Sequence, residues 1–133
     1  MGIRLLLAED HQIVRRNLRT LLQDHEGWQV VAEAGDGCEA VRLAEAHRPD
    51  VAVIGLAMPV LNGIETTRRI VERLPATKVI VLSTHSDDIY AEQARLAGAF
   101  GFVLTDAADV DLPAAIEEVS QGKSFTSPKL TKT

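Results

Sequence analysis

The sequence predicts an α/β protein built on a five-stranded parallel sheet with helices on both faces, a doubly wound (βα)5 arrangement. Two observations lead to this class. Short apolar runs alternate five times with longer segments in which apolar residues recur every three or four positions, as in strands followed by helices. The strand-like runs are apolar nearly throughout, which is typical of parallel strands covered on both faces. At 133 residues the chain has the length of one domain with its own core.

Each strand is predicted where a run rich in Val, Ile, Leu or Ala ends at a turn signal or a polar residue. The predicted strands are residues 3–8, 29–34, 51–54, 78–82 and 100–104. A glycine-rich turn at 35–37 follows the second strand, and the third runs into a loop that contains Pro59 and Gly63. Because parallel strands run in the same direction, the chain needs a crossover connection between consecutive strands, and the intervening helices supply it.

Helices are predicted in the intervening segments. They comprise residues 10 or 11 to 23, then 38–46, 62–73, 87–97 and 111–121. In the first helix, Val14, Leu18 and Leu22 fall on one face, which indicates packing against the sheet.

The helix ends carry recognisable signals. Asn62, Ser86 and Asp111 are the expected N-caps of the last three helices, because their short side chains accept hydrogen bonds from first-turn amides. Gly98 is expected to end the fourth helix. Pro113 would then fall in the first turn of the last helix, where its missing N–H is tolerated.

The composition favours an ordinary cytoplasmic domain. A net charge of −5 argues against nucleic-acid binding by this domain itself, and the scattered arginines are expected to form solvated helix faces. The single cysteine, Cys38, cannot form an internal disulfide, which fits a reducing cytoplasm. No apolar run approaches the ~20 residues of a membrane span, and the N-terminus leads directly into a strand rather than a signal peptide.

Functional groups collect at the predicted carboxyl ends of the strands, where open α/β sheets bind ligands. These positions hold Glu9, Asp10, Gly55, Ser83, Thr84 and Thr105. Acids and hydroxyls therefore surround a central position that has no side chain, Gly55. Taken alone, Gly55 is an ordinary turn glycine, the two acids are a solvated helix N-terminus, and the hydroxyls end backbone segments.

Four segments, taken in order, resemble the receiver domain of bacterial two-component response regulators, of the type that precedes a LuxR/NarL-like helix-turn-helix. They are residues 6–11, 56–65, 81–85 and 97–107, with Met58-Pro59, Asn62-Gly63 and Ala97-Gly98-Ala99 as the most specific text. The resemblance covers residues 1–122. It implies a flavodoxin/CheY-like sheet with strand order 2-1-3-4-5, and a role in phosphorelay signal transduction and transcription regulation rather than an enzyme.

The resemblance also assigns roles at the strand ends. In the family, an aspartate after the third strand accepts a phosphoryl group, paired acids hold Mg²⁺, and a hydroxyl and a lysine bind the phosphoryl oxygens. Matched residue by residue, the acids are Glu9 and Asp10, the hydroxyl is Ser83, the switch aromatic is Phe102, the acceptor position is Gly55 and the lysine position is Thr105. Phe102 is equally expected as a core residue.

Two of these positions depart from the family. Gly55 offers no nucleophile, and Thr105 has no ammonium to pair with a doubly charged group. The resemblance therefore implies that phosphorylation at the family site is lost. It leaves a weak or lost Mg²⁺ site at Asp10 and Glu9, near a backbone carbonyl at Ala57, and no required cofactor.

Three functions remain open from the sequence. The first is a phosphorylation-independent interaction or dimerisation module, with a self-association face on the helices around 14–22 and 116–119. The second is a ligand-sensing pseudo-receiver that uses the room left at Gly55. The third is a phosphorelay receiver with Asp10 or Ser83 as a substitute acceptor.

The expected partners are proteins, including a second copy of this chain and a sensor kinase, with no membrane. DNA would be reached only through a C-terminal domain beyond these residues. Residues 123–133 are polar and contain a proline, so they are predicted to begin an interdomain linker. The four histidines, His11, His25, His47 and His85, lack ligand-like spacing and are expected at the surface.

Overall fold

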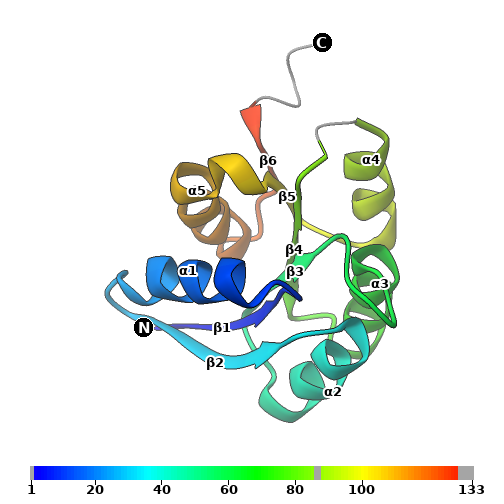
Figure 1. Cartoon of the computed structure of the whole chain (residues 1–133), viewed down its shortest axis with the longest axis horizontal. Coiled ribbons are helices and arrows are strands. Elements are labelled where there is room, and N and C mark those ends of the chain that lie inside the picture. The colour runs from blue at the N-terminus through cyan, green and yellow to red at the C-terminus, as the bar shows by residue number, and fades with distance from the viewer. Residues whose placement is uncertain (1, 86–87, 129–133) are drawn as a thin grey trace.

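The structure is a computed structural model, which describes residues 2–85 and 88–128. A parallel sheet forms the middle layer and helices cover both of its faces (Figure 1). The strands are β1 (Ile3–Ala8), β2 (Trp28–Ala34), β3 (Val51–Gly55), β4 (Lys78–Ser83), β5 (Gly101–Leu104) and β6 (Phe125–Thr126). The helices are α1 (Gln12–Gln23), α2 (Gly37–His47), α3 (Gly63–Arg73), α4 (Asp88–Ala97) and α5 (Ala108–Ser120), with a 3-10 turn η1 (Thr105–Ala107) before α5.

The sheet has six strands rather than the predicted five, in the order β2-β1-β3-β4-β5-β6. The predicted order 2-1-3-4-5 of the first five strands is confirmed. The additional strand, β6, lies in the segment that was expected to begin a linker and pairs in parallel with β5. The sequence did not predict β6, since residues 123–128 are mostly polar. A strand of two residues is also too short to show an alternation of apolar and polar residues.

Helix α5 begins earlier than predicted, with its N-cap four residues before Asp111. Ala107 is its N-cap and Asp111 lies within its first turn, so Pro113 stands inside the helix rather than in its first turn. Asp111 is a helical residue and not the cap, and its carboxylate accepts a hydrogen bond from Ser127 Oγ. The predicted cap Ser86 lies outside the described residues, and Gly98 follows α4 with a φ of +111°, which fits its predicted role.

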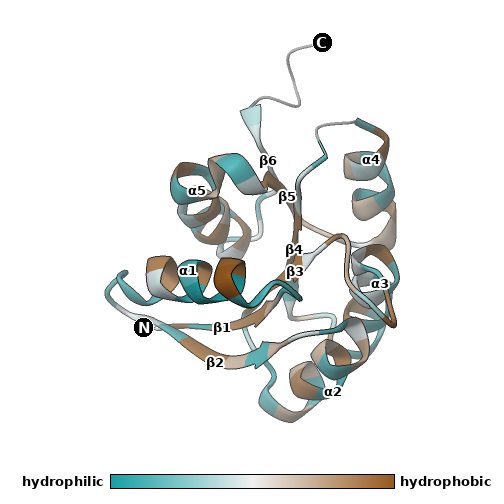
Figure 2. Cartoon of the chain, viewed as in Figure 1, coloured by the Kyte–Doolittle hydropathy of each residue, from teal (hydrophilic) through white to brown (hydrophobic). Residues whose placement is uncertain are grey.

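Two apolar cores lie on the two faces of the sheet. One contains Leu6, Ile54 and Val81 from the sheet and is covered by α2, α3 and α4. The other contains Leu5, Leu7 and Val53, and is covered by α1 and α5. Figure 2 shows the strands as predominantly hydrophobic between two-faced helices. Successive side chains of a strand point into one core and then the other, so nearly every strand residue is buried and apolar. Among the described residues, no helix is long and apolar enough to cross a bilayer.

The loop after β3 is held tightly against two helix starts. The Asn62 side chain accepts the Glu65 N–H at 2.9 Å, and that of Asp36 accepts the Glu39 N–H at 2.8 Å. A Cβ on Gly63 would run into the carbonyl oxygen of Gly55, and one on Gly37 into that of Leu61. The loop is thus fixed by close backbone contacts that only glycine permits.

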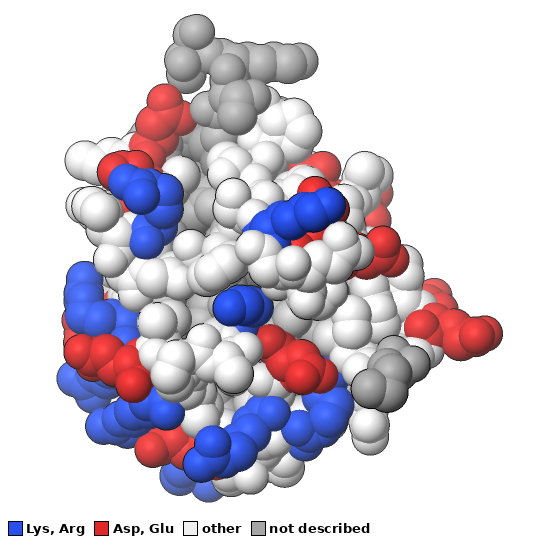
Figure 3. Space-filling view, turned by 180° about the vertical axis from the view of Figure 1, so that it is seen from behind, with Lys and Arg blue, Asp and Glu red and all other residues white. Residues whose placement is uncertain are grey.

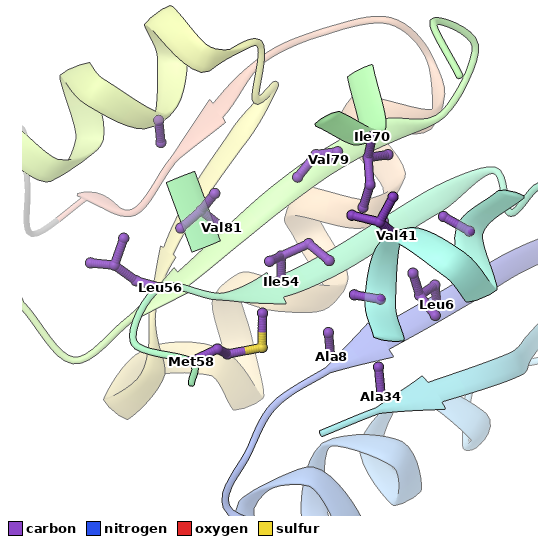
Figure 4. Close-up of a cluster of buried hydrophobic side chains, with 14 of the residues drawn as sticks. Leu6, Ala8, Ala34, Val41, Ile54, Leu56, Met58, Ile70, Val79 and Val81 are labelled. Atoms are coloured by element: carbon purple, nitrogen blue, oxygen red, sulfur yellow. The ribbon is translucent and has the colours of Figure 1, made fainter. Parts of the chain in front are cut away.

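Met58 anchors the same loop from below. Its side chain is 7% exposed and belongs to the core cluster with Ile54 and Ala8. Figure 4 shows the Met58 side chain turned inward beneath the end of β3. The loop that follows Gly55 is therefore packed against the core.

Candidate functional site

The predicted site residues lie along one edge of the sheet. Glu9 and Asp10 follow β1, and the adjacent strand β3 ends at Gly55. Ser83 ends β4, and Thr105 follows β5, the next strand along. Parallel pairing carries these ends to the same side of the molecule, as expected for an open α/β sheet.

The Glu9 carboxylate lies where a side chain on residue 55 would begin. Its Oε1 is 3.0 Å from the position that a Cβ on Gly55 would take, and the Ala8 carbonyl oxygen is 3.4 Å away. The Glu9 side chain is only 12% exposed. A carboxylate is therefore present at the centre of the site, but it comes from β1 and not from β3.

His11 holds the Glu9 carboxylate in place. Oε2 of Glu9 accepts the His11 backbone N–H at 3.1 Å, and His11 Nδ1 also lies 3.1 Å from it. The pKa of His11 is raised above its usual 6.5, first by the hydrogen bond to Glu9 and then by the negative charges of Asp10 and Glu9. His11 is exposed as predicted, but its contact with the two acids was missed; its position directly after them was the available signal.

Asp10 provides the second carboxylate. Its Oδ1 is buried without a hydrogen-bond partner, and the 3.3 Å approach to His11 Nδ1 is a charge contact without hydrogen-bond geometry. Glu9, Asp10 and His11 each place one ligand atom within 4.8 Å of the others. Two carboxylates with an orphaned oxygen fit a divalent cation, and the residues that would hold it are Asp10 and Glu9. Gly55 contributes no side-chain ligand, so the donor set lacks the carboxylate that an aspartate at this position would add.

Arg15 is a cation near the site that sequence reasoning missed. Its Nη1 donates to the Glu9 carbonyl oxygen at 2.6 Å and to that of Ala34 at 3.4 Å, and its Nε lies 3.4 Å from Glu33 Oε1. These bonds fix the ends of β1 and β2 to helix α1. The guanidinium is therefore engaged with backbone and Glu33, and it is not a substitute for the missing lysine. Its spacing of six residues from Glu9 gives no motif by which to find it.

Ser83 closes a local turn. The side chain is 2% exposed, its Oγ accepts the His85 N–H at 2.9 Å, and it donates to the His85 carbonyl oxygen at 3.3 Å. The Ser83 hydroxyl thus both donates to and accepts from the backbone of His85. This is the local role expected of a hydroxyl that ends a backbone segment. Thr84, beside it, is exposed.

Thr105 and Phe102 belong to different surroundings. Thr105 begins η1 and lines a groove of ≈ 590 Å³ between α1 and the start of α5. Phe102 is 3% exposed and packs in the core on the α4 side of the sheet. Of the two roles expected for Phe102, the structure shows the core position.

The structure shows which side chains of the two helices expected to supply a self-association face point into the core and which face solvent. In α1, Leu18 is 6% exposed and Leu22 is fully buried, and in α5 both Ile116 and Val119 are fully buried. These side chains build the core beneath α1 and α5, because they occupy the inward face of each helix. The exposed apolar residue of each helix is instead Ile13, at 71%, and Val110, at 70%.

The arginines of α2 and α3 form the solvated faces that were predicted. Arg68 and Arg69 pair with Glu65, and Arg73 pairs with Glu45 across the two helices. In Figure 3, basic residues gather along the lower part of the view with acidic residues among them. The basic surface seen there is interrupted by acids, unlike a continuous footprint for phosphates.

Comparison with known proteins identifies the relatives of this chain. Residues 5–117 match the response regulator receiver domain family. The transcriptional regulatory protein DegU of Brevibacillus brevis is 36% identical over 129 residues, which are 97% of this chain and 55% of that protein. This chain thus spans little more than half the length of that relative.

Solved structures agree with this result. A two-component response regulator of the LuxR family from Aurantimonas sp. SI85-9A1 has a TM-score of 0.95 and 36% identity, covering 99% of this chain and 94% of that one. A structure of two RcsB dimers bound to two parallel DNAs has a TM-score of 0.90 and 26% identity, covering 99% of this chain and 67% of that one.

Proposed function

This chain belongs to the response regulator receiver domain family, and on that premise we propose that it is an atypical receiver that works without phosphorylation at position 55. It acts in signal transduction by binding protein partners, including a second copy of itself. Any effect on transcription passes through a DNA-binding domain elsewhere in a longer protein, as the DNA-bound RcsB relative suggests.

The observation that carries the proposal is the pair Gly55 and Glu9. Position 55 lacks a nucleophile, and the Glu9 carboxylate approaches the place where a side chain would emerge. Glu9 is itself engaged by His11, and Thr105 supplies no cation. A phosphoryl group at this site would meet a fixed carboxylate with no opposing ammonium, which electrostatics disfavours.

The other two hypotheses receive less support. The Ser83 hydroxyl is buried and satisfied by His85, which argues against Ser83 as a substitute acceptor. Asp10 would have to serve as metal ligand and nucleophile at once. The room that Gly55 would open for a small ligand is narrowed by Glu9 Oε1.

Acetyl phosphate tests the first part of the proposal. The protein is incubated with acetyl phosphate and Mg²⁺ and its intact mass is measured. We expect no phosphoryl adduct. The matched control is the double variant Gly55→Asp/Thr105→Lys, which restores the carboxylate and the ammonium and is expected to gain an adduct. A stoichiometric adduct on the unaltered chain, at Asp10, Ser83 or elsewhere, would contradict the proposal.

The self-association face is proposed on the outer sides of α1 and α5, which lie side by side on one face of the sheet (Figure 1). Helix α1 carries three arginines and no acid, whereas α5 carries four acids and no base. A two-fold arrangement that sets α1 of one copy against α5 of the other brings opposite charges together twice. It also covers exposed Ile13 and Val110, beside the groove that Thr105 lines.

Sedimentation over a concentration series tests this face. Ile13→Glu and Val110→Glu are each expected to weaken dimerisation about tenfold or more, equivalent to about 1.4 kcal/mol. Leu96→Glu is the matched control, because Leu96 is 70% exposed on α4, away from α1 and α5. This face would be contradicted if the chain stays monomeric at all concentrations, or if Leu96→Glu weakens dimerisation as much as Ile13→Glu or Val110→Glu does. Neither outcome bears on the acetyl phosphate test.

A further inference from the structure

The chain beyond α5 returns to the sheet as a sixth strand. Gly122 makes the turn with a φ of +84°, and β6 then runs parallel to β5. The Phe125 N–H donates to the Phe100 carbonyl oxygen at 2.9 Å, and the Ser127 N–H donates to that of Phe102 at 3.0 Å. Phe125 also packs against the core beneath α1 and α5. Residues 125–127 are therefore part of the domain.

Ser127 fastens this strand to two other elements. The residue is fully buried. Its Oγ accepts the Leu104 N–H at 3.0 Å and donates to Asp111 Oδ2 at 2.9 Å. The backbone pairing of β6 with β5 ends at Thr126, and beyond it the Ser127 hydroxyl accepts the N–H of Leu104 in β5. One side chain thus joins β5, α5 and the C-terminal segment.

The two Ser127 bonds bracket the segment that contains Thr105. Leu104 immediately precedes η1, and Asp111 lies in the first turn of α5. The hydroxyl has one proton, so its bond to Asp111 directs its lone pairs toward Leu104. A displacement of residues 105–110 that carries Leu104 or Asp111 away from Ser127 lengthens the corresponding bond.

We propose that Ser127 is a positioning residue that couples the 105–110 segment to the docking of β6 on β5. When the segment is in the arrangement described here, Ser127 is clamped and β6 is docked. A change at the groove between α1 and α5 that moves the segment releases the clamp and frees β6. The coupling does not depend on whether position 55 accepts a phosphoryl group.

Hydrogen exchange and limited proteolysis test the clamp. Ser127→Ala leaves the buried Leu104 N–H without an acceptor, which favours local opening. We expect exchange at Leu104 and trypsin cleavage after Lys123 to become about tenfold faster or more. Ser124→Ala is the matched control, because Ser124 is an exposed serine of the same segment. It is expected to leave both rates unchanged.

Reciprocity separates coupling from simple tethering. Thr105→Lys, placed in the segment, is expected to change the cleavage rate after Lys123, and to do so much less when Ser127→Ala is also present. Additive effects of the two substitutions would overturn the proposal. So would faster cleavage in Ser127→Ala with unchanged exchange at Leu104 and Thr105. If Ser127→Ala does not fold, Asp111→Asn provides the same measurements, because it weakens the acceptor of the Ser127 hydroxyl without removing it.

Discussion

Oε1 of Glu9 lies 3.0 Å from the point that a Cβ atom on Gly55 would occupy. This short distance affects how the absence of a side chain at Gly55 is interpreted. The position has lost its own carboxylate, yet the site retains a carboxylate in nearly the same place, delivered from the neighbouring strand. Residue 55 can regain a side chain only if Glu9 moves, so the two positions are energetically linked.

Restoring the aspartate should destabilise the domain in the absence of a divalent cation. Gly55→Asp places a second carboxylate beside Glu9, and like charges at this distance cost about 1–3 kcal/mol. We expect the melting temperature to fall by several degrees and to recover on addition of Mg²⁺. Gly55→Ala adds the Cβ without the charge and should show no Mg²⁺-dependent recovery. Equal behaviour of the two variants would contradict the linkage.

The His11 imidazole should titrate above its usual value. Its protonated form is stabilised by the Glu9 and Asp10 carboxylates, so its pKa in the folded chain is raised above 6.5. The resulting stabilisation is fully present below pH 6.5 and is lost as the pH rises through the folded pKa. NMR titration measures it directly. Glu9→Gln is expected to lower the midpoint, whereas Glu45→Gln, whose carboxylate pairs with Arg73 on the far side of the sheet, should not.

Gly63 should not tolerate a side chain. A Cβ there would collide with backbone atoms of Gly55 and Leu56, and backbone cannot swing aside. Gly63→Ala is expected to cost about 1–3 kcal/mol in the free energy of unfolding, measured by urea denaturation. Gly35→Ala is the matched control, because the nearest atom to its Cβ would be a side-chain nitrogen of Arg15 at 3.3 Å and not backbone. A Gly63→Ala variant as stable as Gly35→Ala would show that the loop is not fixed as described.

Val60 carries backbone strain beside the site. Its φ is +69°, and the Leu61 N–H donates to the Pro59 carbonyl oxygen at 2.7 Å across it. A β-branched residue with positive φ costs about 1–2 kcal/mol, which a glycine would not incur. The greater freedom of glycine in the unfolded chain offsets part of this. Val60→Gly is therefore expected to stabilise the domain by about 0.5–1 kcal/mol. Thermal unfolding that shows a clear loss of stability would contradict this interpretation.

Local patterns were sufficient for most of the fold. The five principal strands, their helices and the Asn62 cap follow from apolar periodicity and turn residues, which act over a few neighbouring positions. The position of α5 was predicted less well. The carboxylate of Asp111 that was expected to cap the helix bonds to Ser127, sixteen residues away, and no local pattern signals that contact.

The sequence by itself determined the parallel α/β sheet, the strand ends at which the site lies, and the absence of a nucleophile at Gly55 and of an ammonium at Thr105. These depend on residue type and spacing alone. Only the tertiary structure decided that Glu9 fills the space beside Gly55, that Ile13 and Val110 rather than Leu18 and Ile116 remain exposed, and that Ser127 is buried. Each of these depends on which residues distant in the chain meet once the layers have packed.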